Sequence, residues 1–82
     1  KEQKEYSKAE EYYKKAIDTR INGALNNLGF LYQEQKEYLK AEEYYKRAID
    51  AGVNESIHNL RILYTEQNEH TKLEELNQKY KI

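Results

Sequence analysis

The chain has 82 residues, enough for one small domain near the lower limit of what folds around a single core. Its 14 Lys and Arg residues oppose 15 Asp and Glu residues, and the net charge of −1 gives no general attraction to nucleic acid or to an anionic membrane. These residues include no Cys and no apolar run of roughly 20 residues, so we expect no disulfide, no cysteine zinc site and no membrane-spanning helix among them.

Apolar side chains recur at helical spacing along the chain and predict five helices. In chain order we expect these helices at about 4–19, 22–35, 38–51, 54–67 and 69–81. Asn22 and Asn54 stand where helix N-caps are expected, and Gly52 stands at an expected C-terminal stop. The 9 Tyr residues argue against disorder, and the absence of Pro agrees with a helical chain.

The strongest feature of the sequence is an internal repeat with a period of 32 residues. The segments QKEYSKAEEYYKKAID and QKEYLKAEEYYKRAID lie one period apart and differ at only two of sixteen positions. Twenty of the 32 positions in the period are identical, and a third, more divergent copy occupies residues 67–82. A period between roughly 20 and 50 residues indicates stacked supersecondary units.

Each unit consists of two predicted helices, which we call the first-type and the second-type helix. We therefore expect an all-α fold, an α-solenoid of antiparallel helix pairs with about two and a half 32-residue repeats and five helices. Residues 1–82 form a single domain in this interpretation. Its parts are an unpaired second-type helix at 1–20, a repeat at 21–52, and a repeat with a C-terminal capping helix at 53–82.

The third copy carries large residues where the earlier copies carry small ones. The changes are Ala41 to Leu73, Ala48 to Tyr80, Gly29 to Arg61 and, in the opposite sense, Tyr45 to Asn77. Small residues let helices approach closely, so we expect that no further helix packs at these positions and that 69–81 is a C-terminal cap, with the end of the protein near Ile82. We also expect Arg61 to splay the last helix pair slightly.

The stretch NLGFLYQEQKEYLKAEEYYKRAI at 27–49 resembles the tetratricopeptide repeat. The residues that match its motif are Leu25, Leu28, Gly29, Tyr32, Tyr38, Ala41, Tyr45 and Ala48. The period here is 32 rather than about 34. The turn Gly of the motif is replaced by Lys4, Lys36 and Asn68 in the three copies, and the connector at 48–60 is similar to that of the SEL-type repeat.

This resemblance implies a protein–protein interaction scaffold that binds a peptide segment or a partner protein on a concave face lined by first-type helices. The candidate binding residues are Asn26, Asn27, Phe30, Gln33, Glu34, Glu55, His58, Asn59, Ile62 and Glu66. Phe30 and Ile62 would contact an apolar group, and the Glu residues would favour a Lys or Arg on the ligand. Several of these positions differ between the two copies, which fits either a binding surface or drift of an exposed face.

Asn27 and Asn59 are identical in the two copies. In the family, an Asn at this place can bond the backbone of a bound peptide. An intramolecular hydrogen bond is the alternative role for both residues.

Other chemistry is not expected. The Glu10/Glu11, Glu42/Glu43 and Glu74/Glu75 pairs are interpreted as part of a solvated helix face, because Lys or Arg follows four residues after most of them. His58 and His70 lack the close spacing of metal ligands. We predict no enzyme, no catalytic residue, no cofactor and no metal. Because the inner helices are neutral to acidic, we predict no nucleic acid partner.

Two alternatives to a peptide-binding scaffold remain open. The chain could be a structural fragment of a longer array that forms a homo-oligomer through its open N-terminal end, where Ala9, Tyr13 and Ala16 are expected to be exposed. It could also be an engineered repeat without a natural partner. The cellular compartment is left open, with a slight preference for the cytoplasm.

Overall fold

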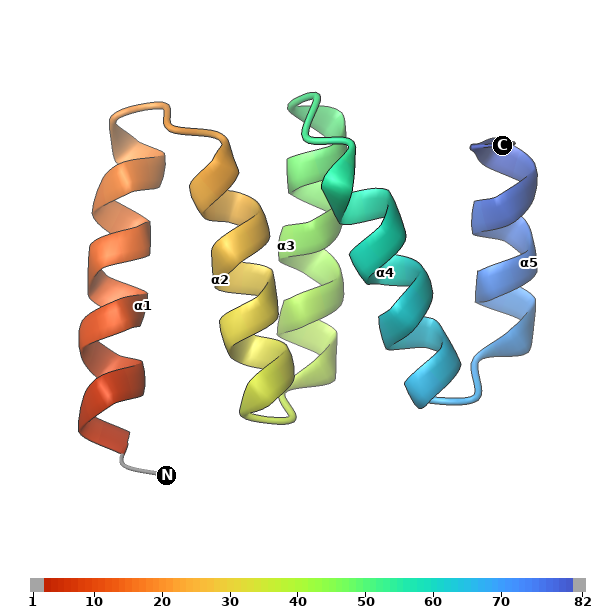
Figure 1. The fold of residues 1–82 in the computed structure, drawn as a ribbon, viewed down its shortest axis with the longest axis horizontal. Helices are drawn as coiled ribbons and strands as arrows, with labels where there is room; N and C mark the ends of the chain where they lie inside the picture. Colours follow the sequence, from red (N-terminus) through yellow and green to blue (C-terminus); the bar gives the residue numbers. More distant parts are fainter. Residues whose placement is uncertain (1–2, 81–82) are drawn as a thin grey trace.

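Five helices follow one another along the chain, each antiparallel to the helix before it, in the computed structural model (Figure 1). The structure describes residues 3–80. The helices are α1 (Gln3–Asp18), α2 (Gly23–Glu34), α3 (Tyr38–Asp50), α4 (Glu55–Glu66) and α5 (His70–Lys79). The predicted all-α solenoid with five helices is confirmed, and the helix bounds lie close to those expected. Lys81, the last position of the fifth predicted helix, lies outside the described residues.

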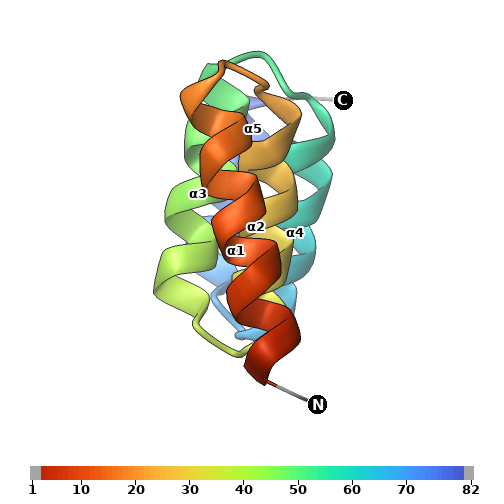
Figure 2. The ribbon, with the colours of Figure 1, turned by 90° about the vertical axis from the view of Figure 1, so that its left-hand side faces the viewer.

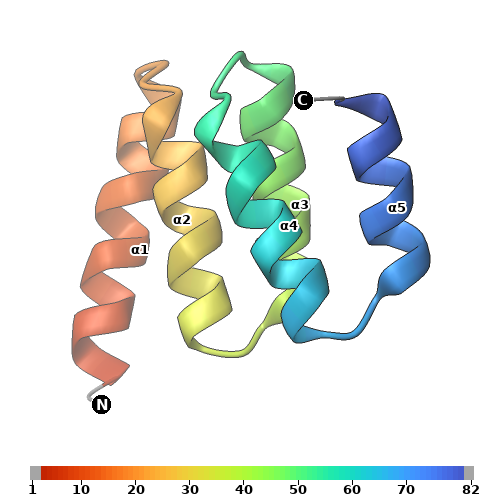
Figure 3. The same ribbon diagram turned by 45° about the vertical axis from the view of Figure 1, so that its right-hand side comes forward.

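The helices form two layers, with α2 and α4 in one layer and α1, α3 and α5 in the other. Figure 2 looks along the stack and separates α3 from α4, and Figure 3 shows α2 and α4 running side by side in the same direction. The backbones of α2 and α4 approach each other directly, whereas those of α1, α3 and α5 do not. None of the helices in residues 3–80 has the length and apolarity needed to cross a membrane.

The core lies between the two layers and depends on small residues where helices approach closely. Tyr45, Ala41 and Ala48 of α3 are fully buried. Gly29 of α2 faces the ring of Tyr45, and a Cβ atom added at Gly29 would lie 2.7 Å from its Cδ1 atom. The predicted roles of Gly29, Ala41 and Ala48 as close-approach positions are therefore confirmed.

Helices α1 to α4 all end in the same backbone motif, in which a residue of positive φ follows the last turn. These residues are Arg20, Lys36, Gly52 and Asn68, with φ of 65°, 63°, 93° and 58°. After α3, Gly52 N–H donates to Ile49 O at 3.0 Å and Val53 N–H donates to Ala48 O at 2.9 Å, the bond pair of a Schellman motif. The predicted stop at Gly52 is confirmed. Lys4, in contrast, is no turn residue and lies inside α1.

The predicted N-cap positions of α2 and α4 are confirmed, but the two Asn side chains do not act as caps. Asn22 and Asn54 do precede α2 and α4, but neither side chain makes a capping hydrogen bond. Both residues already have helical backbone angles, with φ of −63° and −65°. A side-chain cap usually needs an extended residue that can reach back to the first free N–H groups.

The expectation that no helix packs beyond α5 stays a prediction, whereas the contact of Arg61 with α5 itself is described by the structure. In the second copy a small Gly29 faces a large Tyr45, and in the third copy a large Arg61 faces a small Asn77. Arg61 Nε donates to Asn77 Oδ1 at 2.6 Å, so α5 still packs against α4. The large residue lies on the second-type helix in the first pair and on the first-type helix in the second pair, so the summed volume of the two side chains stays similar.

At the other end of the stack, Ala9, Tyr13 and Ala16 are half-buried rather than exposed. Ala9 and Tyr13 pack against the hydrophobic core, because α2 covers this side of α1. Tyr12 is the aromatic residue of α1 that is open to solvent, with 68% of its surface exposed.

Candidate functional site

All ten residues predicted to bind a partner lie on α2 and α4, the two helices of one layer. We call the surface that they form the α2–α4 face. Phe30 on α2 and Ile62 on α4 occupy equivalent positions one period apart, and they are 52% and 40% exposed. Both helices are fixed from behind by buried residues such as Leu28 and Leu60, so the two exposed apolar side chains stand on a rigid support.

A partly buried polar bridge joins α2 to α4. Asn26 Oδ1 accepts a hydrogen bond from Ser56 Oγ at 2.6 Å and another from Asn59 Nδ2 at 2.9 Å. Ser56 is fully buried, so its hydroxyl depends on this bond. Asn26 and Asn59 are thus hydrogen-bonded within the fold. Of the two roles considered for Asn59, peptide binding or an intramolecular bond, the structure has the intramolecular bond. Ser56 was missed from sequence because its counterpart one period earlier, Ala24, has no polar group.

A second bridge lies near the other end of the two helices. Gln33 Nε2 donates to Glu66 Oε1 at 2.9 Å, and Gln33 Oε1 accepts from the hydroxyl of Tyr45 at 2.7 Å. Burial, together with the nearby carboxylates of Glu66 and Glu34, raises the pKa of the Tyr45 phenol. The hydroxyl therefore stays protonated and keeps donating, which holds the amide of Gln33 in one orientation.

The remaining polar residues of the α2–α4 face are open to solvent. Asn27 and Glu34 on α2 are exposed, as are Glu55 and His58 on α4. None of these four makes a side-chain hydrogen bond with another described residue. A ligand on this face would therefore meet Phe30, Ile62 and these four side chains without breaking a bond of the fold.

The interpretation of the paired Glu residues as a solvated face is wrong for Glu42. Its side chain is 11% exposed and lies between α3, α4 and α5. The hydroxyl of Tyr64 donates to Glu42 Oε2 at 2.6 Å, and Lys46 and Lys72 lie 3.2 and 3.4 Å from its oxygens. Burial acts to raise the pKa of Glu42, but the bonds from Tyr64 and Lys46 and the Lys charges outweigh it, so the pKa is lowered.

The same arrangement occurs one period earlier. Tyr32 on α2 donates to Glu10 on α1 at 2.6 Å, and Lys14 lies 3.1 Å from the same carboxylate. The bonds from Tyr32 and Lys14 lower the pKa of Glu10. The sequence did carry a signal for these contacts, since a Glu precedes a Tyr by 22 residues in both copies.

Two family models match this chain, and each match covers whole helices of the structure. A model of the tetratricopeptide repeat matches residues 23–51, which span α2 and α3, and a second model of that repeat matches residues 1–20, which include α1. The comparison with curated proteins finds no match. The similarity of the connector at 48–60 to the SEL-type repeat stays a prediction. Within residues 3–80, no three His, Asp or Glu side chains are grouped so that they could hold a metal ion.

Proposed function

The chain belongs to the tetratricopeptide repeat family, and from this we propose that it is an interaction module that binds a peptide segment of a partner protein on the α2–α4 face. Tetratricopeptide repeats are generally protein–protein interaction modules and typically non-catalytic. The observation that carries the proposal is the pair of exposed apolar side chains, Phe30 and Ile62, at equivalent positions of neighbouring helices. Such a pair presents apolar contacts at a regular spacing to an extended ligand.

The charges around this pair define the ligand further. Glu34, Glu55 and Glu66 lie on the same two helices, and no Lys or Arg stands among the ten predicted binding residues. A carboxylate-rich rim favours a ligand with Lys or Arg beside its apolar residues. It disfavours capture of a free peptide carboxylate, which would need a basic residue on this face. We expect micromolar affinity at best, because two helices offer less surface than a standard interface.

A peptide-display selection against the purified protein tests the proposal. We expect enrichment of a motif with an apolar residue next to a basic one, and loss of its binding by at least tenfold in the double variant Phe30→Ala/Ile62→Ala. Neither side chain is part of the buried core, so the double variant should fold normally. The matched control is Leu39→Ala/Tyr12→Ala, which removes two exposed apolar side chains from the other layer. Equal binding by all three proteins would refute the α2–α4 face as the site.

Charge reversal tests the basic part of the motif. We expect Glu34→Lys/Glu55→Lys to select against Lys and Arg in the enriched peptides while leaving their apolar residue unchanged. Glu66 is left intact because it holds Gln33. An unchanged preference for basic residues would show that the carboxylates of this face do not contact the ligand.

Self-association is a second candidate, and the exposure of Tyr12 favours it. Its counterpart one period later, Tyr44, is half-buried and packs against Tyr32 with ring centroids 5.5 Å apart. Tyr12 lacks such a neighbour among the first-type helices described and is 68% exposed. Light scattering over a range of concentrations checks this alternative. A dimer that is lost on Tyr12→Glu would support it, and a monomer at every concentration would remove it.

A further inference from the structure

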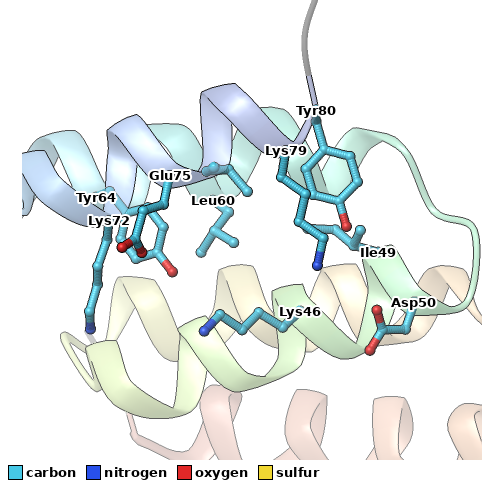
Figure 4. Close-up of a pocket in the computed structure, with 10 residues that line it drawn as sticks. Lys46, Ile49, Asp50, Leu60, Tyr64, Lys72, Glu75, Lys79 and Tyr80 are labelled. Carbon is cyan, nitrogen blue, oxygen red and sulfur yellow. The ribbon is translucent and has the colours of Figure 1, made fainter.

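A hollow of about 370 Å³ lies between α3, α4 and α5, and none of the ten residues of the α2–α4 face lines it. In Figure 4, α5 lies above the hollow, α3 lies below it and α4 lies behind it. Leu60, Tyr64 and Leu76 contribute its apolar wall, and Lys46 from α3 and Lys79 from α5 reach toward its opening. Its volume is within the range of small ligand sites.

The corresponding junction between α1, α2 and α3 is built from the same parts. In each junction a Tyr hydroxyl donates to a Glu, that Glu pairs with the Lys four residues later, and a second Lys lies over the Tyr ring. The first set is Tyr32, Glu10, Lys14 and Lys40, and the second set is Tyr64, Glu42, Lys46 and Lys72. The two junctions can therefore be compared position by position.

They differ at three positions of the lining, because Tyr44, Arg47 and Ala48 of the first junction are replaced by Leu76, Lys79 and Tyr80 in the second. In the first junction the ring of Tyr44 packs on Tyr32 at 5.5 Å between centroids, and the guanidinium of Arg47 lies 4.8 Å from the Tyr44 centroid. In the second junction Leu76 and Lys79 hold these positions. A Leu side chain is smaller than a phenol ring, and Tyr80, which replaces the small Ala48, lines the hollow without filling it, so space is left open beside Leu76.

We propose that this hollow is a binding site for one tyrosine side chain of a partner protein, whose ring takes the place that Tyr44 fills in the first junction. The ring packs on Tyr64 and Leu76. Lys79 stands at the position of Arg47 and borders the bound ring; its ammonium lies 5.6 Å from the centroid of the Tyr80 ring, and it has no carboxylate partner among the described residues. Asp50 and Glu75 at the edge accept N–H groups, and Lys46 donates to a carbonyl, which suits a peptide backbone.

An NMR titration of the ¹⁵N-labelled protein with a capped Gly-Tyr-Gly peptide tests the site, with capped Gly-Leu-Gly as the control ligand. We expect saturable shifts in α3 and α5 with a Kd in the millimolar range, because one ring supplies few contacts. Gly-Leu-Gly should bind at least fivefold more weakly. Leu76→Tyr fills the hollow from within and should weaken Gly-Tyr-Gly binding at least tenfold.

Tyr44→Leu provides an independent test, because it removes the ring from the first junction. We expect this variant to gain a second Gly-Tyr-Gly site whose shifts lie in α1 and α3. Phe30→Ala/Ile62→Ala should leave Gly-Tyr-Gly binding unchanged, which separates this site from the α2–α4 face. The proposal is overturned if the native protein shows no saturable binding, if Leu76→Tyr binds as the native protein does, or if Tyr44→Leu gains no site. Binding of free p-cresol without binding of Gly-Tyr-Gly would overturn the partner protein as the source of the ring.

Discussion

At the scale of single residues, the most consequential contact is the buried carboxylate of Glu42. A charge removed from water destabilises a protein unless other groups replace its hydration. Tyr64, Lys46 and Lys72 do so from three directions and from three different helices. The lowered pKa means that Glu42 is ionised at neutral pH. It therefore links α3 to α4 and α5.

Removal of the Tyr64 hydroxyl is expected to weaken this link. Tyr64→Phe leaves a buried carboxylate without its shortest bond, and a hydrogen bond to a charged group contributes about 1.5–3 kcal/mol. We expect a loss of that size in the free energy of unfolding, measured by urea denaturation. Tyr32→Phe is the matched control, since the Glu10 side chain is 31% exposed and water can replace the lost donor. Equal losses in the two variants would show that burial of Glu42 has no special effect.

At the scale of helices, the ends of α1 to α4 share one backbone motif but not one residue type. A residue with a side chain is strained at positive φ, by roughly 1–2 kcal/mol. Gly52 avoids this strain after α3, whereas Arg20 after α1 and Lys36 after α2 accept it. The repeat has therefore kept the geometry of its turns without keeping the residue that suits them best.

A Gly at Lys36 should stabilise the protein. Relief of the strain exceeds the extra entropy that Gly has in the unfolded chain, so we expect Lys36→Gly to raise the free energy of unfolding by up to about 1 kcal/mol. Lys36→Ala keeps the strain and serves as the control, with little change expected. Thermal unfolding of the three proteins checks this. A destabilised Lys36→Gly would mean that the Lys36 side chain has a favourable contact that outweighs the strain.

The helices themselves were predictable from sequence because their apolar spacing is local and occurs in repeated copies. The contacts between repeats were not predictable from sequence. Asn26 bonds with Asn59 and Gln33 with Glu66, so both pairs are 33 residues apart in a chain whose period is 32. This offset of one residue depends on how α2 and α4 are rotated toward each other, which no local pattern fixes. The sequence therefore assigned the candidate residues to two helices that the structure does bring together, but it did not separate residues bonded within the fold from free ones.

Burial of Glu42 was unpredictable for a similar reason. Glu42 and Glu43 are chemically identical and adjacent, and both have a basic residue four positions later. Only the packing of α4 and α5 decides which of them is covered. The N-cap positions of Asn22 and Asn54 were predictable, but the absence of a side-chain bond was not, because such a bond depends on φ and ψ of a single residue, which the presence of Asn does not determine.

At the scale of the whole molecule, groups with shifted pKa values set the pH range of stability: two carboxyl groups act on the acidic side, and three phenols together with the exposed Lys14 act on the alkaline side. Glu10 and Glu42 have a lowered pKa in the folded protein, so their contribution is complete above the ordinary value of 4.5 and is lost as the pH falls through the folded value. Tyr32, Tyr45 and Tyr64 have a raised pKa, so their contribution is complete below 10.0 and is lost as the pH rises through the folded value.

We therefore expect a plateau in the free energy of unfolding between about pH 5 and pH 9.5, with a decline on either side. Urea denaturation at a series of pH values measures this profile. Glu42→Gln removes one of the two groups behind the acidic decline, so the decline should be shallower in this variant than in the native protein. An acidic decline of the same steepness in both proteins would place its origin in other carboxylates.

The two hydrogen-bonded pairs that join α2 to α4, which we call the joint, use different residue positions on the two helices, because their partners are 33 residues apart and the period is 32. Asn26 and Gln33 supply one half of the joint, Asn59 and Glu66 supply the other, and α2 itself carries the equivalents of that other half at Asn27 and Glu34. The single helix α2 thus carries the residues of both halves of the joint. A tandem copy of residues 21–52, inserted between α3 and α4, would place Asn27 and Glu34 of the copy beside Asn26 and Gln33 of the original. The protein could therefore be lengthened by whole repeats without any new residue type at that joint.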